Sequence, residues 1–326
     1  MEFNEIHQKG KSKMKKNVVI LGSINCDIVA SAAKLPAKGE TVSGSSVDMF
    51  NGGKGANQSV QCSLLGMPTS LIGQIGNDMQ GKTVFQGLLD KGINCRYIHH
   101  SDHHRTGCAS IYLDPAGDNM LVYAPGANHH ITQKMIDDAS EAIGSAGVFL
   151  TQTELNLDAV QYGLKTAHES GAVTILNPAP AIPLPDDIYP LIDYITPNET
   201  ESEVYTGILR KDMPIEDWKE QTARWFIDRG VRNLCITMGE KGAFYSNGTV
   251  SVSVDAFPIK AVDTTAAGDS FHGGLAYGLI NNYPIKTCLK IGSACGALAA
   301  MGLGAQNSIQ PLERVLSFLS EHGVRP

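Results

Sequence analysis

Short apolar runs alternate with segments of helical periodicity along most of the chain. Residues 17–22 form a β-branched run that ends in glycine, which is typical of a buried central strand. Similar runs recur at residues 69–75, 147–151, 172–176, 192–196 and 233–238, and helical periodicity is found at residues 55–65, 81–91, 158–170 and 218–229. This alternation predicts an α/β fold in which a mostly parallel sheet is covered by helices on both faces.

Two stretches depart from this pattern. Residues 26–50 and 105–124 alternate apolar and polar positions around turn residues and lack a helical segment. We predict that they form a small antiparallel β lid, inserted in an α/β domain that spans residues 17–320. Residues 1–16 carry five lysines and are predicted to be a disordered basic extension, with a nucleic-acid-binding arm as the alternative.

Composition narrows the class of protein and of partner. The 326-residue chain is 42% hydrophobic and 18% charged, which favours a folded protein with a sizeable core. Its formal net charge of -7 argues against nucleic acid or an anionic membrane as the partner. The seven cysteines lie far apart and form no CxxC pair, so neither a disulfide framework nor a zinc site is expected. We therefore expect a cytoplasmic protein with a small-molecule partner.

The segment that points most directly to chemistry is DTTAAGD, residues 263–269, which precedes a predicted helix. Small residues immediately before a helix leave backbone N–H groups unpaired and directed at one point, so this turn is suited to hold an anion. Asp269 lies at the rim of the turn, where its carboxylate is placed to accept the proton of an attacking hydroxyl. A helix N-cap is the alternative role for this aspartate.

A second glycine-rich segment, NGGKGANQ at residues 51–58, opens another predicted helix. Its glycines allow backbone N–H groups to approach a ligand closely, and the side chains of Lys54 and Asn57 can hydrogen-bond sugar hydroxyls. An ordinary tight turn is the alternative for this segment taken alone.

These segments belong to a set of four motifs that occur in order along the chain. They are GSINCD at residues 22–27, GGKGAN at 52–57, ITPNETE at 195–201 and DTTAAGD at 263–269. From residue 17 to about residue 315 the chain resembles the ribokinase (PfkB carbohydrate kinase) family. The resemblance implies a ribokinase-like three-layer α/β sandwich with a mostly parallel central sheet and a small antiparallel β lid.

The resemblance also assigns roles to residues around the acceptor. Asp269 is implied as the general base, and the backbone N–H groups of Ala266, Ala267 and Gly268 as the anion hole for the transferring phosphate. Many members of the family have glycine where this chain has Ala266. The implied sugar-binding residues are Asn25, Asp27, Gly53, Lys54, Asn57, Glu154 and Asp269. For Asp27 a strand-end cap is the alternative.

Nucleotide and cation sites are implied in the same way. Asn198, Thr237, Gly239, Gly242 and Gly268 correspond to the nucleotide-binding residues, and Glu201 is expected to hold Mg²⁺ through water. For Asn198 the alternative is a cap of a helix that begins at Glu199. A potassium site is implied at Asp263, Thr265, Ala299, Gly302, Gly304 and Ser308.

The implied activity is transfer of a phosphoryl group from MgATP to the primary 5-hydroxyl of D-ribose. The alternatives are a related kinase for another small sugar or nucleoside, such as deoxyribose, and a sugar-binding regulator without catalysis. The implied cofactors are ATP, Mg²⁺ and K⁺, and the resemblance leads us to expect a homodimer formed through the lids.

Two other features compete with this interpretation. Residues 76–83 (GNDMQGKT) match the phosphate-binding P-loop pattern, although Asp78 would bring a carboxylate toward bound phosphate. The histidines His99, His100, His103 and His104 suggest a metal site, but the polar sequence around them favours a solvated loop. His129 and His130 are likewise expected at the surface.

Overall fold

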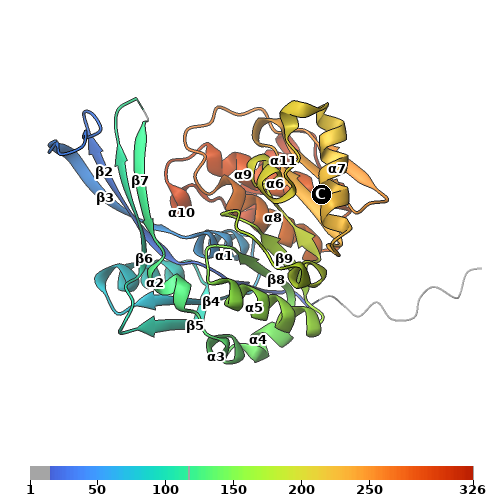
Figure 1. Ribbon diagram of the computed structural model, residues 1–326, viewed down its shortest axis with the longest axis horizontal. Helices are drawn as coiled ribbons and strands as arrows, with labels where there is room; N and C mark the ends of the chain where they lie inside the picture. Colours follow the sequence, from blue (N-terminus) through green and yellow to red (C-terminus); the bar gives the residue numbers. More distant parts are fainter. Residues whose placement is uncertain (1–14, 117, 326) are drawn as a thin grey trace, which may run out of the picture.

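The computed structural model describes residues 15–116 and 118–325. Within these ranges the central layer is a nine-stranded sheet (Figure 1). From one edge to the other its strands are β13 (Ser251–Val254), β12 (Ala243–Ser246), β11 (Asn233–Thr237), β10 (Tyr194–Ile195), β9 (Val173–Asn177), β8 (Ala146–Gln152), β1 (Asn17–Leu21), β4 (Thr69–Gly76) and β5 (Asn94–Ser101). Strand β12 runs antiparallel to both neighbours, and the other pairs are parallel. The predicted basic extension lies outside the described residues, apart from its last two.

Strand β1 shows why the sheet is covered on both faces. Val18 and Ile20 pack into one hydrophobic cluster, whereas Val19 and Leu21 pack into another. Successive side chains of a strand point to opposite faces, so a strand that is apolar at every position needs cover on both. The prediction of a buried central strand is therefore confirmed.

The helices form the two outer layers. The helices whose apolar residues join the Val18 cluster are α1 (Lys54–Leu64), α2 (Met79–Asp90), α8 (Ala267–Ile280), α9 (Ile285–Ala300) and α11 (Leu312–Glu321). Those that join the Val19 cluster are α3 (Gln133–Asp137), α4 (Ser140–Gly144), α5 (Leu157–Glu169), α6 (Glu199–Thr206) and α7 (Ile215–Ile227). The short α10 (Ala305–Ser308) follows α9. The predicted three-layer α/β sandwich is confirmed.

A second sheet projects from the body (Figure 1). Its order is β3 (Gly44–Gly52), β2 (Asn25–Ala32), β6 (Gly107–Leu113) and β7 (Asn119–Ala124). Two antiparallel hairpin-like pairs, β2 with β3 and β6 with β7, are joined in the middle by a parallel pairing of β2 with β6. Strands β2 and β3 leave the body after β1 and return to it at the start of α1, whereas β6 and β7 leave it after β5 and return at the 3-10 helix Gly126–His130. Because all of these excursions follow the ends of parallel strands, the lid stands beside the carboxyl ends of the central strands.

One predicted strand is much shorter than its apolar run. The run at residues 192–196 gives only the two-residue β10, because Asp193 turns its side chain into the ladder. Asp193 Oδ2 accepts a hydrogen bond from the backbone N–H of Thr174 at 2.9 Å, in place of a main-chain acceptor. No helix in the described part of the chain has the length and apolarity needed to cross a membrane.

Candidate active site

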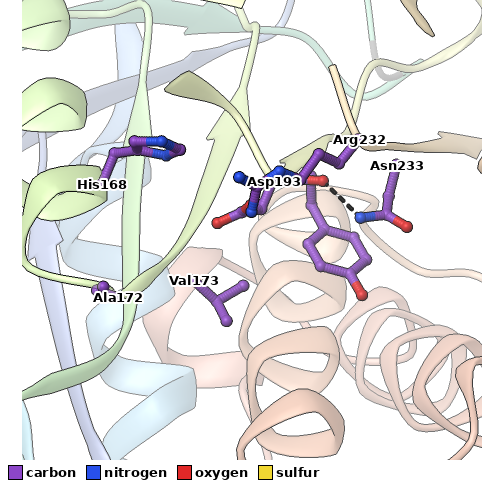
Figure 2. Close-up of a pocket in the computed structure, with 8 residues that line it drawn as sticks. His168, Ala172, Val173, Asp193, Arg232 and Asn233 are labelled. Carbon is purple, nitrogen blue, oxygen red and sulfur yellow. Dashed lines mark hydrogen bonds and ion pairs between the residues drawn. The ribbon is translucent and has the colours of Figure 1, made fainter. Parts of the chain in front are cut away.

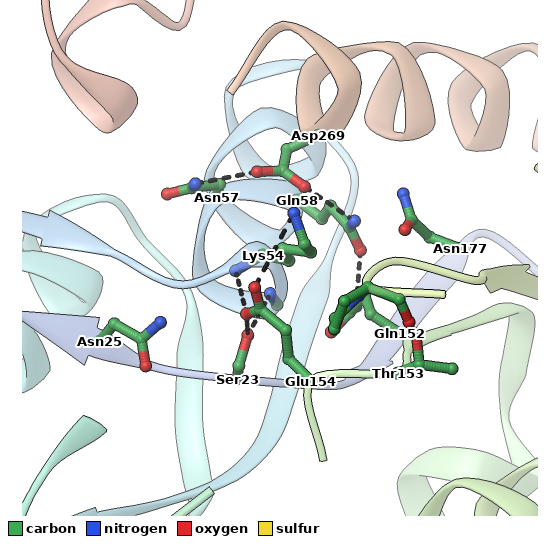
Figure 3. Close-up of polar contacts among 12 residues, drawn as sticks. Ser23, Asn25, Lys54, Asn57, Gln58, Gln152, Thr153, Glu154, Asn177 and Asp269 are labelled. Carbon is green, nitrogen blue, oxygen red and sulfur yellow. Dashed lines mark hydrogen bonds and ion pairs between the residues drawn. The ribbon is translucent and has the colours of Figure 1, made fainter. Parts of the chain in front are cut away.

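Asp269 contacts the start of α1, although the two lie more than 200 residues apart in the chain. Asn57 Nδ2 donates to Asp269 Oδ2 at 2.9 Å, and Gln58 Nε2 donates to Oδ1 at 3.0 Å (Figure 3). Gln152 Nε2 donates in turn to Gln58 Oε1 at 2.6 Å. Asp269 is only 7% exposed. The candidate base is therefore fixed by two amides and lies next to the predicted sugar-binding segment.

The glycines of the GGKGAN motif allow α1 to approach the loop after β1. Gly53, the N-cap of α1, has φ 91°, and a Cβ there would lie 2.7 Å from Ser23 O. A Cβ on Gly55 would lie 2.5 Å from Gly22 Cα. A side chain at either position would clash with backbone, and Gly53 also has a φ that other residues rarely adopt. The motif thus brings Lys54 and Asn57 against the central sheet.

Lys54 lies among carboxylates. Its Nζ is 3.8 Å from Glu154 Oε1, and Ser23 Oγ donates to Glu154 Oε2 at 2.6 Å (Figure 3). Burial alone would lower the pKa of Lys54, but the charges of Asp269, Glu154 and Glu201 outweigh it and raise that pKa. Lys54 therefore carries a positive charge between the candidate base and Glu154.

Asn25 and Asp27 lie on β2, at the base of the lid. Asn25 Oδ1 accepts a hydrogen bond from Asn128 Nδ2 at 2.7 Å, which fixes the amide and leaves Asn25 Nδ2 to face the site. Asp27 is the third residue of β2, so it is not a strand-end cap. Burial, and then the charge of Glu154, raises the pKa of Asp27 to about 6. A sugar hydroxyl that donates to Asp27 would favour its ionised form.

The turn before α8 has the form of an anion site. Ala266, the N-cap of α8, is left-handed with φ 61° and offers no side-chain cap. Along the described chain the N–H groups of Ala266 and Gly268 have no hydrogen-bond acceptor, whereas Ala267 N–H donates to Thr264 O at 3.2 Å. Two of the three predicted donors are therefore free, and Ala267 is engaged within the turn. The left-handed conformation of an alanine costs about 1–2 kcal/mol, which a glycine would avoid.

His272, one turn further along α8, was not predicted as a site residue. Its Nδ1 lies 2.6 Å from Gly268 O, and since a carbonyl only accepts, Nδ1 carries the proton. The single lone pair of its Nε2 then accepts from Thr196 Oγ1 at 2.5 Å, and Asn177 Nδ2 lies 3.0 Å from the same nitrogen. Burial lowers the pKa of His272 to about 4, so the ring is neutral. His272 thus ties the anion turn to the carboxyl ends of β9 and β10.

Four of the predicted nucleotide residues, Asn198, Thr237, Gly239 and Gly242, lie at the carboxyl ends of β10 and β11, whereas Gly268 is the second residue of α8. Asn198 and Thr237 form a parallel bridge. Asn198 and Glu201 also form a capping box at the start of α6, each side chain accepting from the other's backbone N–H at 2.8 Å. Asn198 therefore caps α6, as the alternative prediction stated. The cap uses Asn198 Oδ1 and Glu201 Oε2, so Glu201 Oε1 remains available to a ligand.

Gly239 and Gly242 frame the short turn between β11 and β12. Both have positive φ, and a Cβ on Gly242 would lie 1.9 Å from Val254 O. Glycine is therefore required for the turn itself, whatever ligand approaches it.

The predicted potassium residues form two adjoining loops. Asp263 Oδ1 accepts from Thr265 N at 2.9 Å, and Oδ2 accepts from Gly304 N at 2.9 Å. Gly302 N donates to Ala299 O at 3.1 Å, and Gly302 packs so closely on Ser308 that a Cβ would lie 2.7 Å from Ser308 Cβ. The donors available to a cation here are oxygens, mainly main-chain carbonyls, because both oxygens of the Asp263 carboxylate already accept N–H groups.

The P-loop-like segment is closed to phosphate by its own aspartate. Asp78 is the N-cap of α2, and its carboxylate accepts from Gly81 N at 2.7 Å and from Thr106 N at 2.9 Å. Lys82 and Thr83 are exposed. A carboxylate therefore occupies the place at the helix N-terminus where a phosphate would bind.

The histidines do not gather into a metal site. His104 and His130 stack with ring centroids 3.4 Å apart, and His99 Nε2 lies 3.9 Å from Asp138 Oδ2. No group of three or more His, Cys, Asp or Glu side chains suited to a metal ion occurs in the described ranges.

A cavity of about 420 Å³ lies away from these residues (Figure 2). It is lined by His168, Asp193, Arg232 and Asn233, at the amino ends of β9, β10 and β11. Its polar groups satisfy one another, since Arg232 Nη1 pairs with Asp193 Oδ1 at 2.6 Å and Asn233 Nδ2 donates to Asp193 O at 2.8 Å. In parallel α/β sheets ligands bind at the carboxyl ends, so the cluster around Asp269 is the better candidate.

Sequence reasoning missed four polar residues of the site: Gln58, Gln152, His272 and Tyr123. Gln58 follows the GGKGAN motif directly, and its position one residue beyond Asn57 was the available signal. The others had no such signal, because Gln152 is the last residue of β8, Tyr123 is the last but one of β7, and His272 lies within an apolar helix.

Comparison with known proteins agrees with this geometry. Residues 15–312 match the family described as pfkB family carbohydrate kinase. The chain is 37% identical to ribokinase of Haemophilus influenzae, covering 95% of this chain and 100% of that protein. It is 31% identical to deoxyribokinase of Salmonella typhi, with 93% and 99% covered. The structure of Arabidopsis thaliana ribokinase complexed with ribose and ATP superposes with a TM-score of 0.89 at 30% identity, covering 94% of this chain and 99% of that one. The chain therefore belongs to the pfkB family of carbohydrate kinases.

Proposed function

We propose that this protein transfers the γ-phosphoryl group of MgATP to the primary 5-hydroxyl of D-ribose and releases ribose 5-phosphate and ADP. The observation that carries the proposal is the hydrogen bond between Asn57 and Asp269. It brings the candidate base, the free amides of the α8 turn and the sugar-binding face of α1 into one cluster. The relatives named ribokinase, one of them solved with ribose and ATP, support ribose as the acceptor.

In this proposal Asp269 accepts the proton of the attacking hydroxyl. Asn57 and Gln58 hold the two carboxylate oxygens, so the base needs no reorientation before the reaction. The N–H groups of Ala266 and Gly268 stabilise the negative charge that spreads over the transferring phosphoryl oxygens. Lys54 balances the charge of Asp269 while no phosphate is bound.

Selection of the sugar is assigned to the lid and to Glu154. Asn25 Nδ2 can donate to a hydroxyl whose own proton is accepted by Asp27, so this pair suits vicinal hydroxyls. A buried polar pair is left without partners by a sugar that lacks one of these hydroxyls, which disfavours deoxyribose. The lid excludes water, which would otherwise compete for the phosphate.

The residues present suit both implied cations. Glu201 Oε2 accepts the Asn198 N–H, which leaves Oε1 to hold Mg²⁺ through water. Mg²⁺ neutralises charge on the nucleotide phosphates when it is bound. The oxygen donors of the Asp263 and Gly302 loops, among them Thr265, Gly304, Ala299 and Ser308, suit K⁺. We assign nucleotide contacts to Thr237, Gly239 and Gly242.

A homodimer through the lids and a cytoplasmic location complete the proposal. The outer lid face, opposite Asp27, carries Val47, Met49, Met120 and Val122, which are 50 to 68% exposed. Apolar side chains on an open sheet favour cover by a second copy. Each of the seven cysteines, all within the described residues, is a free thiol, which suits a reducing compartment. Sedimentation of a Val122→Glu variant as a monomer would support this dimer, and unchanged sedimentation would exclude it.

The assay that tests the activity is ribose-dependent production of ADP from ATP. We expect turnover with D-ribose, a lower kcat/KM with 2-deoxy-D-ribose and little with hexoses, and faster turnover when potassium replaces a bulky organic cation. Release of ADP without sugar is the control for ATP hydrolysis. If no pentose, hexose or nucleoside stimulates ADP release, the catalytic proposal fails and a sugar-binding regulator becomes the better account.

A further inference from the structure

A row of three paired residues crosses the inner face of the lid. Asp27 on β2 pairs with Ala109 on β6, and Ala109 pairs with Tyr123 on β7. Residues paired across strands project to the same face of a sheet. The phenol of Tyr123 therefore shares a face with the Asp27 carboxylate, and only the small methyl group of Ala109 stands between them.

The hydroxyl of Tyr123 is buried without a partner. In the described part of the molecule its oxygen makes no hydrogen bond. A buried hydroxyl without a partner destabilises a folded protein, and such groups are few. The Asn57 Oδ1 atom, in the same site, is also buried without a partner. Gln152 Oε1 is a third such atom in the site. Unsatisfied polar atoms gathered in one site indicate a polar ligand that supplies the missing bonds.

The groups around this hydroxyl are those of the sugar site. Burial raises the pKa of Tyr123, the charge of Glu154 raises it further, and the amides of Asn25 and Asn128 act in the opposite direction. The phenol is therefore protonated and can donate. Gly107, which pairs with Asn25, keeps the space open, because a Cβ there would lie 2.3 Å from both Asn25 Oδ1 and Asn128 Nδ2.

We propose that Tyr123 is a specificity-determining residue whose hydroxyl binds a secondary hydroxyl of the sugar, the one also held by Asn25 and Asp27. Such a hydroxyl gives its proton to Asp27 and accepts from Asn25 Nδ2 and from the phenol, which satisfies all of its bonding capacity. The site would then select pentoses that carry this secondary hydroxyl. This inference rests on the proposed sugar-kinase function and names the substrate class that the lid selects.

The test compares the wild-type protein with Tyr123→Phe on D-ribose, 2-deoxy-D-ribose and 3-deoxy-D-ribose. Losing one neutral hydrogen bond should lower kcat/KM for ribose about three- to tenfold. For the deoxy sugar that lacks the contacted hydroxyl the loss should be less than about twofold, because no bond remains to be lost. Tyr162→Phe is the matched control, because it removes an exposed hydroxyl on α5 that donates to Asp137 at the end of α3.

Thermal unfolding without sugar separates this role from a structural one. Because the hydroxyl has no partner in the free protein, Tyr123→Phe should unfold at the wild-type temperature or higher. A lowered unfolding temperature, or an equal loss of kcat/KM on all three sugars, would overturn the proposal. If the wild-type protein phosphorylates none of them, the kinase proposal fails. The role of Tyr123 is then tested by measuring the affinity of wild type and Tyr123→Phe for the same sugars by calorimetry. Weaker binding by the variant would then support its role, whereas equal binding, or no binding to either protein, would rule it out.

Discussion

Two helices of this protein begin after a turn of small residues and carry an aspartate nearby, yet only one of them begins at a candidate active site. At α2 the aspartate, Asp78, is the N-cap itself, and its carboxylate accepts the Gly81 N–H within the first turn. At α8 the N-cap is Ala266, and Asp269 is the third residue of the helix, turned sideways toward Asn57.

The position of the carboxylate relative to the cap explains the difference. The N-terminus of a helix attracts negative charge, and a side chain that satisfies it leaves no site for a ligand. Asp78 does this for α2, whereas the methyl group of Ala266 cannot accept a hydrogen bond, so amides of α8 stay free. A motif of glycines and small residues therefore predicts an anion site only when no local acceptor fills it.

The largest effect is expected from removing the base. Asp269→Asn should lower kcat about 10²- to 10⁴-fold, because a neutral amide cannot accept the proton of the acceptor hydroxyl. Affinity for ATP, measured by calorimetry, should stay within severalfold, because the main-chain donors of the turn are unchanged. A kcat within tenfold of wild type would show that the carboxylate is not the base and would remove the contrast between the two helices.

The second effect concerns how the free amides are held. His272→Leu should lower kcat/KM for ATP about tenfold and should reduce the free energy of unfolding by about 1–3 kcal/mol, because Thr196 and Asn177 each lose a buried partner. His272→Gln, whose amide can still donate to Gly268 O, should recover part of both. Since the pKa of His272 lies near 4, the loss should be constant from pH 6 to pH 9.

In His272→Leu the loss of kcat/KM should come from a higher KM for ATP, and KM for ribose should stay nearly unchanged. A positioning role for His272 would be contradicted if the loss of kcat/KM changed with pH near neutrality, or if it affected ribose and not ATP.

The fold and the main segments of the candidate site could be predicted from the sequence because the signals for them are local. The apolar run of β1 and the glycines of the Gly53 turn indicate the local backbone conformation directly, so both could be predicted without knowledge of their neighbours in space. The amide chain from Gln152 through Gln58 to Asp269 depends instead on contacts between residues about 94 and 211 positions apart, which no spacing encodes. His272 escaped prediction for the same reason.

The short strand β10 shows a second reason why the sequence pattern alone does not predict the structure fully. Its apolar run predicts a longer strand, but the Asp193 side chain takes the Thr174 N–H that a ladder would use. A side chain that competes with the backbone changes the outcome only when the neighbouring strand lies in reach, which is a tertiary condition.

A third, smaller effect falls on stability alone. Asp78→Ala should reduce the free energy of unfolding by about 1–2 kcal/mol at pH 7, as expected for a lost N-cap, with kcat retained. Burial alone would raise the pKa of Asp78, but hydrogen bonds from Thr106 and Gly81 outweigh it and lower that pKa below its ordinary value of 3.8. The ionised carboxylate therefore stabilises the fold above about pH 4, and this contribution disappears as the pH falls through the lowered pKa.

Urea unfolding at pH 7 and at pH 3 tests this, since the difference between wild type and Asp78→Ala should shrink in acid. A difference that grows in acid would mean that Asp78 is not held as an ionised cap.

The smallest effect is expected at the lysine of the P-loop-like segment. Lys82 is exposed on α2, and its backbone N–H donates within the helix to Asp78 O at 3.1 Å. Lys82→Ala should leave kcat and both KM values within severalfold of wild type, because a phosphate cannot displace the Asp78 carboxylate from the helix end. The same ADP assay measures this variant beside Asp269→Asn. If Lys82→Ala were inactive and Asp269→Asn active, the phosphate site would belong to α2, and the cap position would not be what distinguishes the two helices.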